Sequence, residues 1–468
     1  MKKMLLALSL SGALLGGSVA WAEESVTATT PTSDVAVTTV ETSPIETTNE
    51  PEVAAVAEIS TTEAAESEAV LDTGDTAWIL VSTALVLLMT IPGLALFYGG
   101  MVRKKNVLNT MAYSFVAAAV VSIVWVVVGY SLAFGEGNAF IGSLDKVMLA
   151  GIGTDALSGS IPEILFVIFQ MTFAIITVAI ISGSIAERMK FGAFVAFIAI
   201  WVVVVYAPIT HWVWGGGWLG NDGALDFAGG TVVHINSGVA GLVAAYMLGK
   251  RMGLGRESMA PHNLTLTVIG ASLLWVGWFG FNGGSALGAN GAAGYALVVT
   301  QVAAAAAAIA WLVVEKLVRG KGSVLGAASG AIAGLVVITP AAGFVTVGGA
   351  LAMGLIGGVV CFWGITALKR ALKADDSLDA FGLHGVGGIV GAILTAFFAS
   401  EFIMGDAAPS NLMSQLWVQV EGVLATIAYS AVLTFIILKV IDLTIGIRVA
   451  AEDERMGLDL SQHGERVE

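Results

Sequence analysis

Two histidines lie inside long apolar stretches, where an ionisable side chain is unfavourable to bury and usually serves a function. His234 and His384 each have glycine four and seven residues later, in "HINSGVAG" and "HGVGGIVG". One interpretation is a pair of core histidines satisfied by backbone carbonyls. The other is a pair of neutral imidazoles in an apolar channel, which would suit the passage of a small hydrogen-bonding molecule or a proton.

A metal site is a third interpretation of the two histidines. Zinc needs three or four protein ligands, and no third histidine, cysteine or well-placed carboxylate accompanies the pair. Cys361, the only cysteine, lies in an apolar run, which leaves no disulfide and no cysteine-based metal site. We therefore predict no metal, no cofactor and no catalytic residue. His211, His262 and His463 are interpreted as structural or solvated.

An aspartate precedes each histidine, at Asp226 and at Asp379. An acid at a helix start can cap free N–H groups and complement the helix dipole, which is our interpretation of Asp379. Asp226 would also make an outer vestibule more negative and so favour cations. Eight helical residues, about 12 Å, separate Asp226 from His234, so the two are not an acid–base pair.

Aromatic residues recur at helical spacing. Phe169 and Phe173 are four residues apart, and Ser285 follows Phe281 at the same distance. Packing in the core or against lipid is the ordinary role of such residues. Taken together, they would instead form a cation-binding aromatic cage with a hydroxyl acceptor, above a phenyl constriction that blocks hydrated ions. The residues concerned are Phe169, Phe173, Trp214, Trp278, Phe281 and Ser285.

The composition predicts an all-α polytopic membrane protein. Of the 468 residues, 57% are hydrophobic and 12% charged, whereas soluble domains carry about 25% charged residues. Apolar runs of about 20 residues predict eleven transmembrane helices. They lie near 77–101, 107–134, 162–184, 191–213, 228–249, 263–285, 292–317, 323–341, 346–368, 379–399 and 416–441.

Positive charges predict the orientation of these spans. Apart from Lys146, the basic residues of the body follow odd-numbered spans or end the chain. Basic loops mark the cytoplasmic side, so the N-terminus is expected outside and the C-terminus inside. A weak repeat fits this odd count: "LFYGG" resembles "GFNGG", and the two histidine motifs resemble each other. Two inverted five-helix repeats plus a final helix are therefore predicted, with the path at their interface.

The chain divides into four predicted segments. Residues 1–22, "MKKMLLALSLSGALLGGSVAWA", fit a cleavable signal peptide, with an uncleaved anchor as the alternative. Residues 23–76 are rich in Thr and Glu, contain no Lys or Arg and supply most of the net charge of −14. They are expected to be a disordered acidic tail outside the cell. Residues 77–441 form the transmembrane domain and 442–468 a cytoplasmic tail. Nothing suggests nucleic-acid binding.

Several long stretches carry a family resemblance. They read "TALVLLMTIPGLALFYGGMVRKKNVL", "YSLAFGEGN", "FQMTFAIITVAIISGSIAER", "HWVWGGGWL", "GALDFAGGTVVHIN", "WFGFNGGSA" and "FGLHGVGGIVG". In this order they resemble the ammonium transporter (Amt) family of the Amt/Mep/Rh superfamily, over roughly residues 75 to 465. Trp214 favours the bacterial Amt branch over the Rh proteins.

The resemblance implies a role for each candidate residue. Phe169, Trp214 and Ser285 match an outer recruitment site for ammonium ion, and Asp226 matches an acid behind it with a structural and electrostatic role. The remaining matches are a phenyl gate, Phe173 and Phe281, and a pore lined by His234, His384 and Trp278.

The resemblance also implies a mechanism and partners. Ammonium ion, or its analogue methylammonium, is recruited and deprotonated, and ammonia crosses the pore with or without separate proton transfer. A homotrimer in the bacterial inner membrane is implied, with a PII-type (GlnK-like) signal protein docking on the cytoplasmic face. The alternatives are an ammonium sensor with little transport, whose relatives usually carry an appended signalling domain, and a membrane enzyme, for which no nucleophile or cofactor motif is present.

Overall fold

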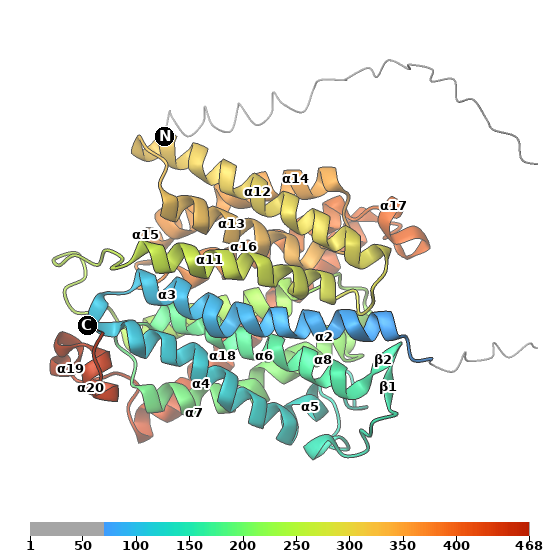
Figure 1. Cartoon of the computed structure of the whole chain (residues 1–468), viewed down its shortest axis with the longest axis horizontal. Coiled ribbons are helices and arrows are strands. Elements are labelled where there is room, and N and C mark those ends of the chain that lie inside the picture. Colours follow the sequence, from blue (N-terminus) through green and yellow to red (C-terminus); the bar gives the residue numbers. More distant parts are fainter. Residues whose placement is uncertain (1–69, 468) are drawn as a thin grey trace, which may run out of the picture. The chain divides into compact units, whose positions relative to one another are not determined.

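The computed structural model describes residues 70–467, so the predicted signal peptide and most of the acidic segment lie outside the described residues. In the described part, eleven helices are long and apolar enough to cross a membrane. They run side by side in one bundle (Figure 1). The prediction of an all-α polytopic protein with eleven transmembrane helices is confirmed.

The first five spans are built from α-helices and from short 3-10 or π-helical segments, which are labelled η. They are α2 (Thr73–Leu88), η1 (Met89–Leu94) and α3 (Ala95–Met101) in span one; η2 (Lys104–Asn106), α4 (Val107–Val124), η3 (Trp125–Gly129) and α5 (Tyr130–Phe134) in span two; α6 (Glu163–Ile185) in span three; α7 (Phe191–Trp201), η5 (Val202–Tyr206), α8 (Ala207–Trp214) and α9 (Trp218–Asn221) in span four; and η6 (Gly230–Ile235) and α10 (Asn236–Leu248) in span five.

The next five spans and the last one follow. They are α11 (Leu264–Trp278) and η7 (Phe279–Gly283) in span six; α12 (Gly291–Arg319) in span seven; α13 (Val324–Ile338) and η8 (Thr339–Ala341) in span eight; α14 (Val347–Trp363), η9 (Gly364–Leu368) and α15 (Lys369–Leu372) in span nine; η10 (Phe381–Gly385) and α16 (Val386–Phe398) in span ten; and α18 (Leu412–Thr444) in span eleven. Short elements connect or follow the spans: η4 (Val147–Leu149), the antiparallel strands β1 (Leu157–Ser158) and β2 (Ile161–Pro162), α17 (Glu401–Met404), η11 (Gly405–Ala407), α19 (Ala451–Met456) and α20 (Leu458–His463).

Helix caps extend the first and last spans beyond their apolar cores. Helix α2 begins at Thr73, before the predicted boundary at 77, because the Asp72 side chain accepts a hydrogen bond from the backbone N–H of Asp75. Helix α18 begins at Leu412, because the Asn411 side chain caps its first turn. Side-chain oxygens satisfy the free N–H groups of a first turn, so polar residues outside the apolar run join the helix.

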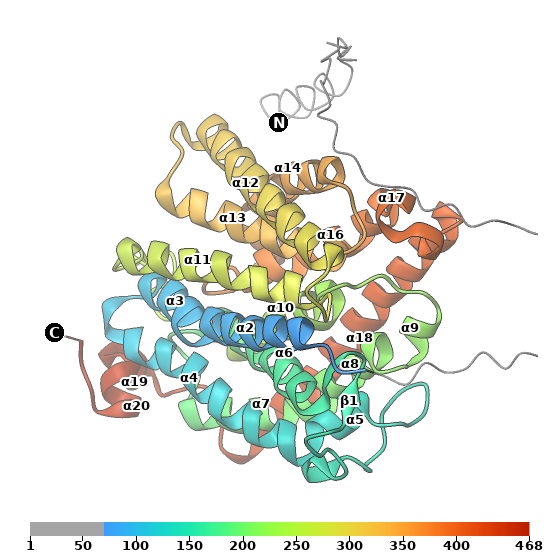
Figure 2. The same cartoon turned by 45° about the vertical axis from the view of Figure 1, so that its right-hand side comes forward.

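The two ends of the bundle differ. Helices α19 and α20 lie at one end, termed the tail end, and the β1–β2 hairpin and α17 lie at the other, termed the hairpin end (Figures 1 and 2). Span five finishes at the tail end, where the carbonyl of Leu248 accepts from Arg448. Span ten starts there, after Asp375, which pairs with Arg251. The two histidine-bearing spans therefore run in opposite directions, as inverted repeats require.

Buried ion pairs tie the connections together at the tail end. Glu187 pairs with Arg103 at 2.9 Å and with Arg251 at 3.2 Å, and Arg251 also pairs with Asp375 at 2.9 Å. Burial alone would raise the pKa of Glu187, but the two guanidinium groups outweigh it and hold that pKa below its usual range. The same cluster joins the ends of spans one, three, five and nine.

The C-terminal segment packs onto its own bundle. The Asp459 carboxylate accepts from the backbone N–H of Asn109 at 2.8 Å, and the Glu454 carboxylate accepts from that of Met252 at 2.6 Å. Leu458 is buried. The charged C-terminal segment is therefore not freely solvated.

Candidate functional site: a histidine-lined cavity beneath an aromatic cluster

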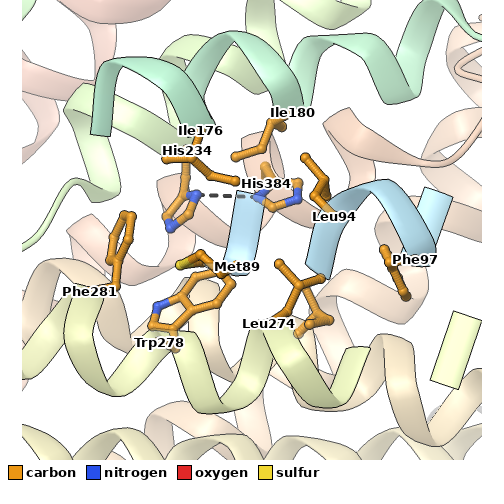
Figure 3. A pocket seen from close by; sticks show the side chains of 11 residues that line it. Met89, Leu94, Phe97, Ile176, Ile180, His234, Leu274, Trp278, Phe281 and His384 are labelled. Atoms are coloured by element: carbon orange, nitrogen blue, oxygen red, sulfur yellow. Dashed lines mark hydrogen bonds between the residues drawn. The ribbon is translucent and has the colours of Figure 1, made fainter. Parts of the chain in front are cut away.

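His234 and His384 face each other in the middle of the bundle. Their Nδ1 atoms lie 3.2 Å apart, within hydrogen-bond distance (Figure 3). The two residues are 1% and 3% exposed. Since the bond joins two like nitrogens, one ring must donate its Nδ1–H and the other must accept, so neutral rings hold opposite tautomers. Nε2 of His234 is buried without a hydrogen-bond partner among the described residues.

Glycines allow the two histidine-bearing spans to approach. A Cβ atom at Gly238, four residues after His234, would overlap the backbone of Gly385. A Cβ atom at Gly388, four residues after His384, would lie 2.8 Å from the carbonyl oxygen of Gly230. The glycine four residues after each histidine therefore allows its span to approach the backbone of the other histidine-bearing span. Small residues let helix backbones pack closely within a membrane.

The histidines line a small, narrow cavity (Figure 3). Trp278 and Phe281 line it too, and the indole Nε1 of Trp278 donates a hydrogen bond to the hydroxyl of Thr339 at 2.9 Å. Sequence reasoning missed the rest of the lining, which is apolar: Met89, Leu94, Phe97, Ile176, Ile180, Leu274 and Ile332. The imidazoles are thus the principal hydrogen-bonding groups that this cavity offers.

Phe281, which lines the cavity, also contacts a second phenyl ring, that of Phe173. The ring centroids of Phe173 and Phe281 are 4.4 Å apart, and both side chains are buried. Phe281 lies 6.0 Å from the ring of His234, and Phe173 lies 5.9 Å from the indole of Trp214. Trp214, Phe173, Phe281, His234 and His384 therefore form one continuous series of aromatic contacts, contributed by five different spans.

Trp214, Ser285 and Phe169, which lie near the Phe173–Phe281 pair, differ in their exposure to solvent. Trp214 and Ser285 are partly exposed, whereas Phe169 is buried behind them, 5.0 Å from the ring of Phe173. The Ser285 hydroxyl donates to the carbonyl of Phe281 at 2.8 Å, which leaves its oxygen lone pairs available as acceptors. Indole faces and hydroxyl oxygens are groups that bind small cations.

Asp226 is buried and caps span five. Its carboxylate accepts four backbone N–H groups, those of Gly229, Gly230, Thr231 and Val232, at 2.6–3.2 Å. Burial raises the pKa of Asp226, and these four hydrogen bonds oppose that rise. With both oxygens committed to the backbone, this residue supports the site rather than contacting a ligand directly.

The interpretation of Asp379 as the cap of span ten is wrong. Asp379 has a φ of 62° and pairs with Lys369 at 2.6 Å. Asp376 is the cap: its carboxylate accepts the N–H groups of Ala380 and Phe381 at 3.1 and 2.8 Å. The signal was present in the sequence, because Asp376 precedes His384 by the same eight residues that separate Asp226 from His234.

Comparison with known proteins decides which family combines these features. The sequence profile of the Ammonium Transporter Family matches residues 77–468. The chain belongs to the ammonium transporter family. An ammonium transporter of Bacillus subtilis is 53% identical over 84% of this chain and 98% of its own length. The ammonium transporter Amt1 of Archaeoglobus fulgidus is 47% identical over 84% of this chain and 98% of its own length.

Solved structures show the same fold for this ammonium transporter family member. Saccharomyces cerevisiae Mep2 matches with a TM-score of 0.76 and 37% identity, covering 82% of this chain and 88% of Mep2. A structure described as a sensor Amt protein matches with a TM-score of 0.78 and 31% identity, covering 83% and 98%. The ammonium-transporter fold predicted from the sequence is confirmed.

The other histidines of this family member, which the sequence left open as structural or solvated, have hydrogen-bond partners, and His262 Nδ1 lies 3.0 Å from the carbonyl of Val102. His211 bonds the carbonyls of Ala133 and Asn138 at 3.0 and 2.7 Å. His463 bonds the side chain of Asn109 at 3.0 Å. Within residues 70–467, no group of three or more His, Cys, Asp or Glu side chains could hold a metal ion.

Proposed function

We propose that the protein carries ammonium across the membrane by taking up ammonium ion at Trp214 and Ser285 and passing ammonia along His234 and His384. The observation that supports this most is the continuous aromatic series from the partly exposed Trp214, through the adjacent rings of Phe173 and Phe281, to the buried histidines. Family membership supports the choice of ammonium as substrate. The family is one of transporters rather than enzymes.

The selectivity for ammonium over potassium follows from the cost of removing the hydration shell of an ion. Ammonium and potassium ions have the same charge and similar size, but only ammonium can lose a proton. Phenyl rings 4.4 Å apart leave no passage for a hydrated ion in this conformation, and the apolar lining beyond them replaces little of an ion's hydration shell. Neutral ammonia, with hydrogen bonds to imidazole nitrogens, avoids that penalty.

The histidine pair offers a path for the proton. The ring that donates Nδ1–H has a free lone pair on Nε2, which can accept a proton. That ring then passes its Nδ1 proton across the 3.2 Å bond to its partner, which releases a proton from its own Nε2. Transport is electrogenic if the proton crosses in this way and neutral if it returns. Solid-supported-membrane currents on ammonium pulses separate the two, since the neutral mechanism gives no current.

The proposal also covers the orientation of the chain in the membrane and its partners. Basic residues of the odd-numbered connections meet the C-terminal helices at the tail end, where Lys105 and Lys190 donate to tail carbonyls. The positive-inside rule makes this end cytoplasmic. We assign the chain to a bacterial inner membrane as a homotrimer, with a PII-type (GlnK-like) protein binding the tail end. A pull-down under nitrogen-replete conditions that recovers no PII-type protein contradicts that partner.

Uptake of labelled methylammonium, in a strain without its own transporters, tests the function. The native chain is expected to give saturable uptake, and Trp214→Leu and His234→Ala to reduce it. A native chain that reaches the membrane, binds ammonium and gives no uptake would favour the sensor alternative.

A further inference from the structure

Gln419 lies on α18, the span that belongs to neither five-helix repeat. Its side chain is 4% exposed. Its Oε1 accepts from the backbone N–H of Leu225 at 2.8 Å, and its Nε2 donates to the carbonyls of Leu225 and Ala392 at 2.8 and 2.9 Å. Oε1 also accepts from the amide of Gln415 at 3.3 Å. The amide therefore uses both donors and both acceptor positions.

The backbone N–H and the backbone carbonyl of Leu225 both form hydrogen bonds with the side-chain amide of Gln419. A neighbouring β-strand would pair with the same two groups. The backbone from Ala224 to Asp226 belongs to no helix or strand. Backbone groups outside a regular ladder need other partners, and both backbone groups of the half-buried Leu225 pair with Gln419. The next anchor along the chain is Phe227, whose N–H donates to the carbonyl of Pro340 at 3.0 Å.

Two parts of the site are attached directly after Leu225. The carbonyl of Asp226 accepts from Nε1 of Trp214 at 2.8 Å. The carboxylate of Asp226 caps η6, which carries His234. A displacement of Leu225 is therefore transmitted to the indole that faces Phe173 and to the start of the histidine-bearing span.

We infer that Gln419 is a positioning residue for the outer aromatic site, and that it sets the affinity for the transported cation by fixing the Trp214 indole. This inference rests on the proposed function. An amide is required: leucine would remove the partner of both backbone groups of Leu225, and glutamate would place a carboxylate oxygen against the carbonyls of Leu225 and Ala392. The same inference gives span eleven a role in the site, although none of its side chains lines the cavity.

The test is the KM and Vmax of methylammonium uptake, with Vmax corrected for the amount of protein in the membrane. Gln419→Leu is expected to raise KM about tenfold, on the scale of the lost hydrogen bonds to Leu225, and to change Vmax less than twofold. Gln419→Glu is expected to raise KM at least as much, and it carries the comparison if Gln419→Leu fails to reach the membrane. Gln415→Leu, one helical turn away, removes bonds to Gly223 and to Gln419 Oε1 but leaves the bonds between Gln419 and Leu225 in place, and it is expected to leave KM within about twofold.

A double mutant shows whether Gln419 acts through Trp214. In a Trp214→Leu background, Gln419→Leu is expected to add little to the rise in KM, because coupled residues are not additive. Full additivity would overturn the inference, as would a fall in Vmax with unchanged KM. A native chain without uptake contradicts the proposed function. A native chain with uptake, whose KM rises in Trp214→Leu but not in either Gln419 variant, contradicts this inference alone.

Discussion

The hydrogen bond between the two imidazoles makes His234 and His384 one chemical unit. Each ring determines the tautomer of the other, because only one of the two Nδ1 atoms can carry the shared proton. Removing either ring leaves the other buried with a nitrogen that has lost its partner. The pair is therefore expected to respond to substitution as a unit rather than as two independent residues.

The corresponding variants are His234→Ala, His384→Ala and the double variant. Each single change is expected to lower methylammonium uptake by about tenfold or more, on the scale of a lost buried hydrogen bond. The double variant is expected to lie close to the single ones, since residues that act together are not additive. Uptake rates per amount of membrane protein measure this, and effects that multiply would contradict it.

Asp226 and Asp376 cap the two histidine-bearing spans from opposite ends of the bundle. Asp226→Asn and Asp376→Asn each replace one carboxylate oxygen with an amide that opposes a backbone N–H. Each change is expected to lower the free energy of unfolding by about 1–3 kcal/mol. Thermal unfolding of detergent-solubilised protein measures the loss. A melting temperature that stays the same in both variants would show that these hydrogen bonds do not stabilise the fold.

Among the helices, π-helical turns carry residues of the proposed pore and gate. His234 lies in η6, His384 in η10 and Phe281 in η7, all of which are π-helical. A π-helical turn widens the helix and shifts the register of the residues after it, and such turns are frequent at functional sites. The contact between η6 and η10 further depends on the glycines that follow each histidine.

Gly238→Ala tests this close contact. The added methyl group would overlap the backbone of Gly385, so the two spans must separate and the histidine bond must lengthen. Uptake is expected to fall at least fivefold, in line with about 1–3 kcal/mol for overpacking. Gly294→Ala on α12 is the matched control, because a Cβ atom there meets nothing within 4 Å. Equal uptake in the two variants would contradict the packing argument.

Hydropathy was sufficient to predict the spans but not the faces that they present. Lipid-facing and core-facing surfaces are both apolar in this chain, so no periodicity marks Met89, Leu94 or Ile332 as cavity residues. The histidines and aromatic residues could be chosen because their chemistry is unusual in a membrane. The cap at Asp376 was missed because Asp379 lies closer to the helix, and its left-handed backbone, φ 62°, leaves no trace in the sequence.

At the scale of the whole molecule, the tail end is a buried network of charges. Besides the pairs of Glu187, the Asp375 carboxylate is held by Arg251. Burial would raise the pKa of Asp375, but Arg251 and Arg188 lower it overall. These lowered pKa values stabilise the fold above the usual carboxyl range, and that stability is lost as pH falls through them.

Asp379 contributes to stability in the opposite direction. Burial raises its pKa from 3.8 to about 6, with Lys369 opposing and Asp376 adding to the rise. Its contribution to stability is thus fully present below pH 3.8 and is lost as pH rises through about 6. Relative to Asp379→Asn, the native chain is expected to lose stability between pH 4 and pH 7. Melting temperatures of both proteins measured across that range check this, and parallel curves would contradict it.

Flux into proteoliposomes that hold the purified protein tests the central claim most directly, because it compares a cation that can lose a proton with one that cannot. Labelled methylammonium and labelled rubidium, a potassium analogue, are supplied to the same vesicles. The aromatic gate and apolar cavity predict saturable entry of methylammonium, with rubidium entry no faster than into protein-free vesicles. Rubidium entry as fast as that of methylammonium, or no methylammonium entry at all, would contradict the account.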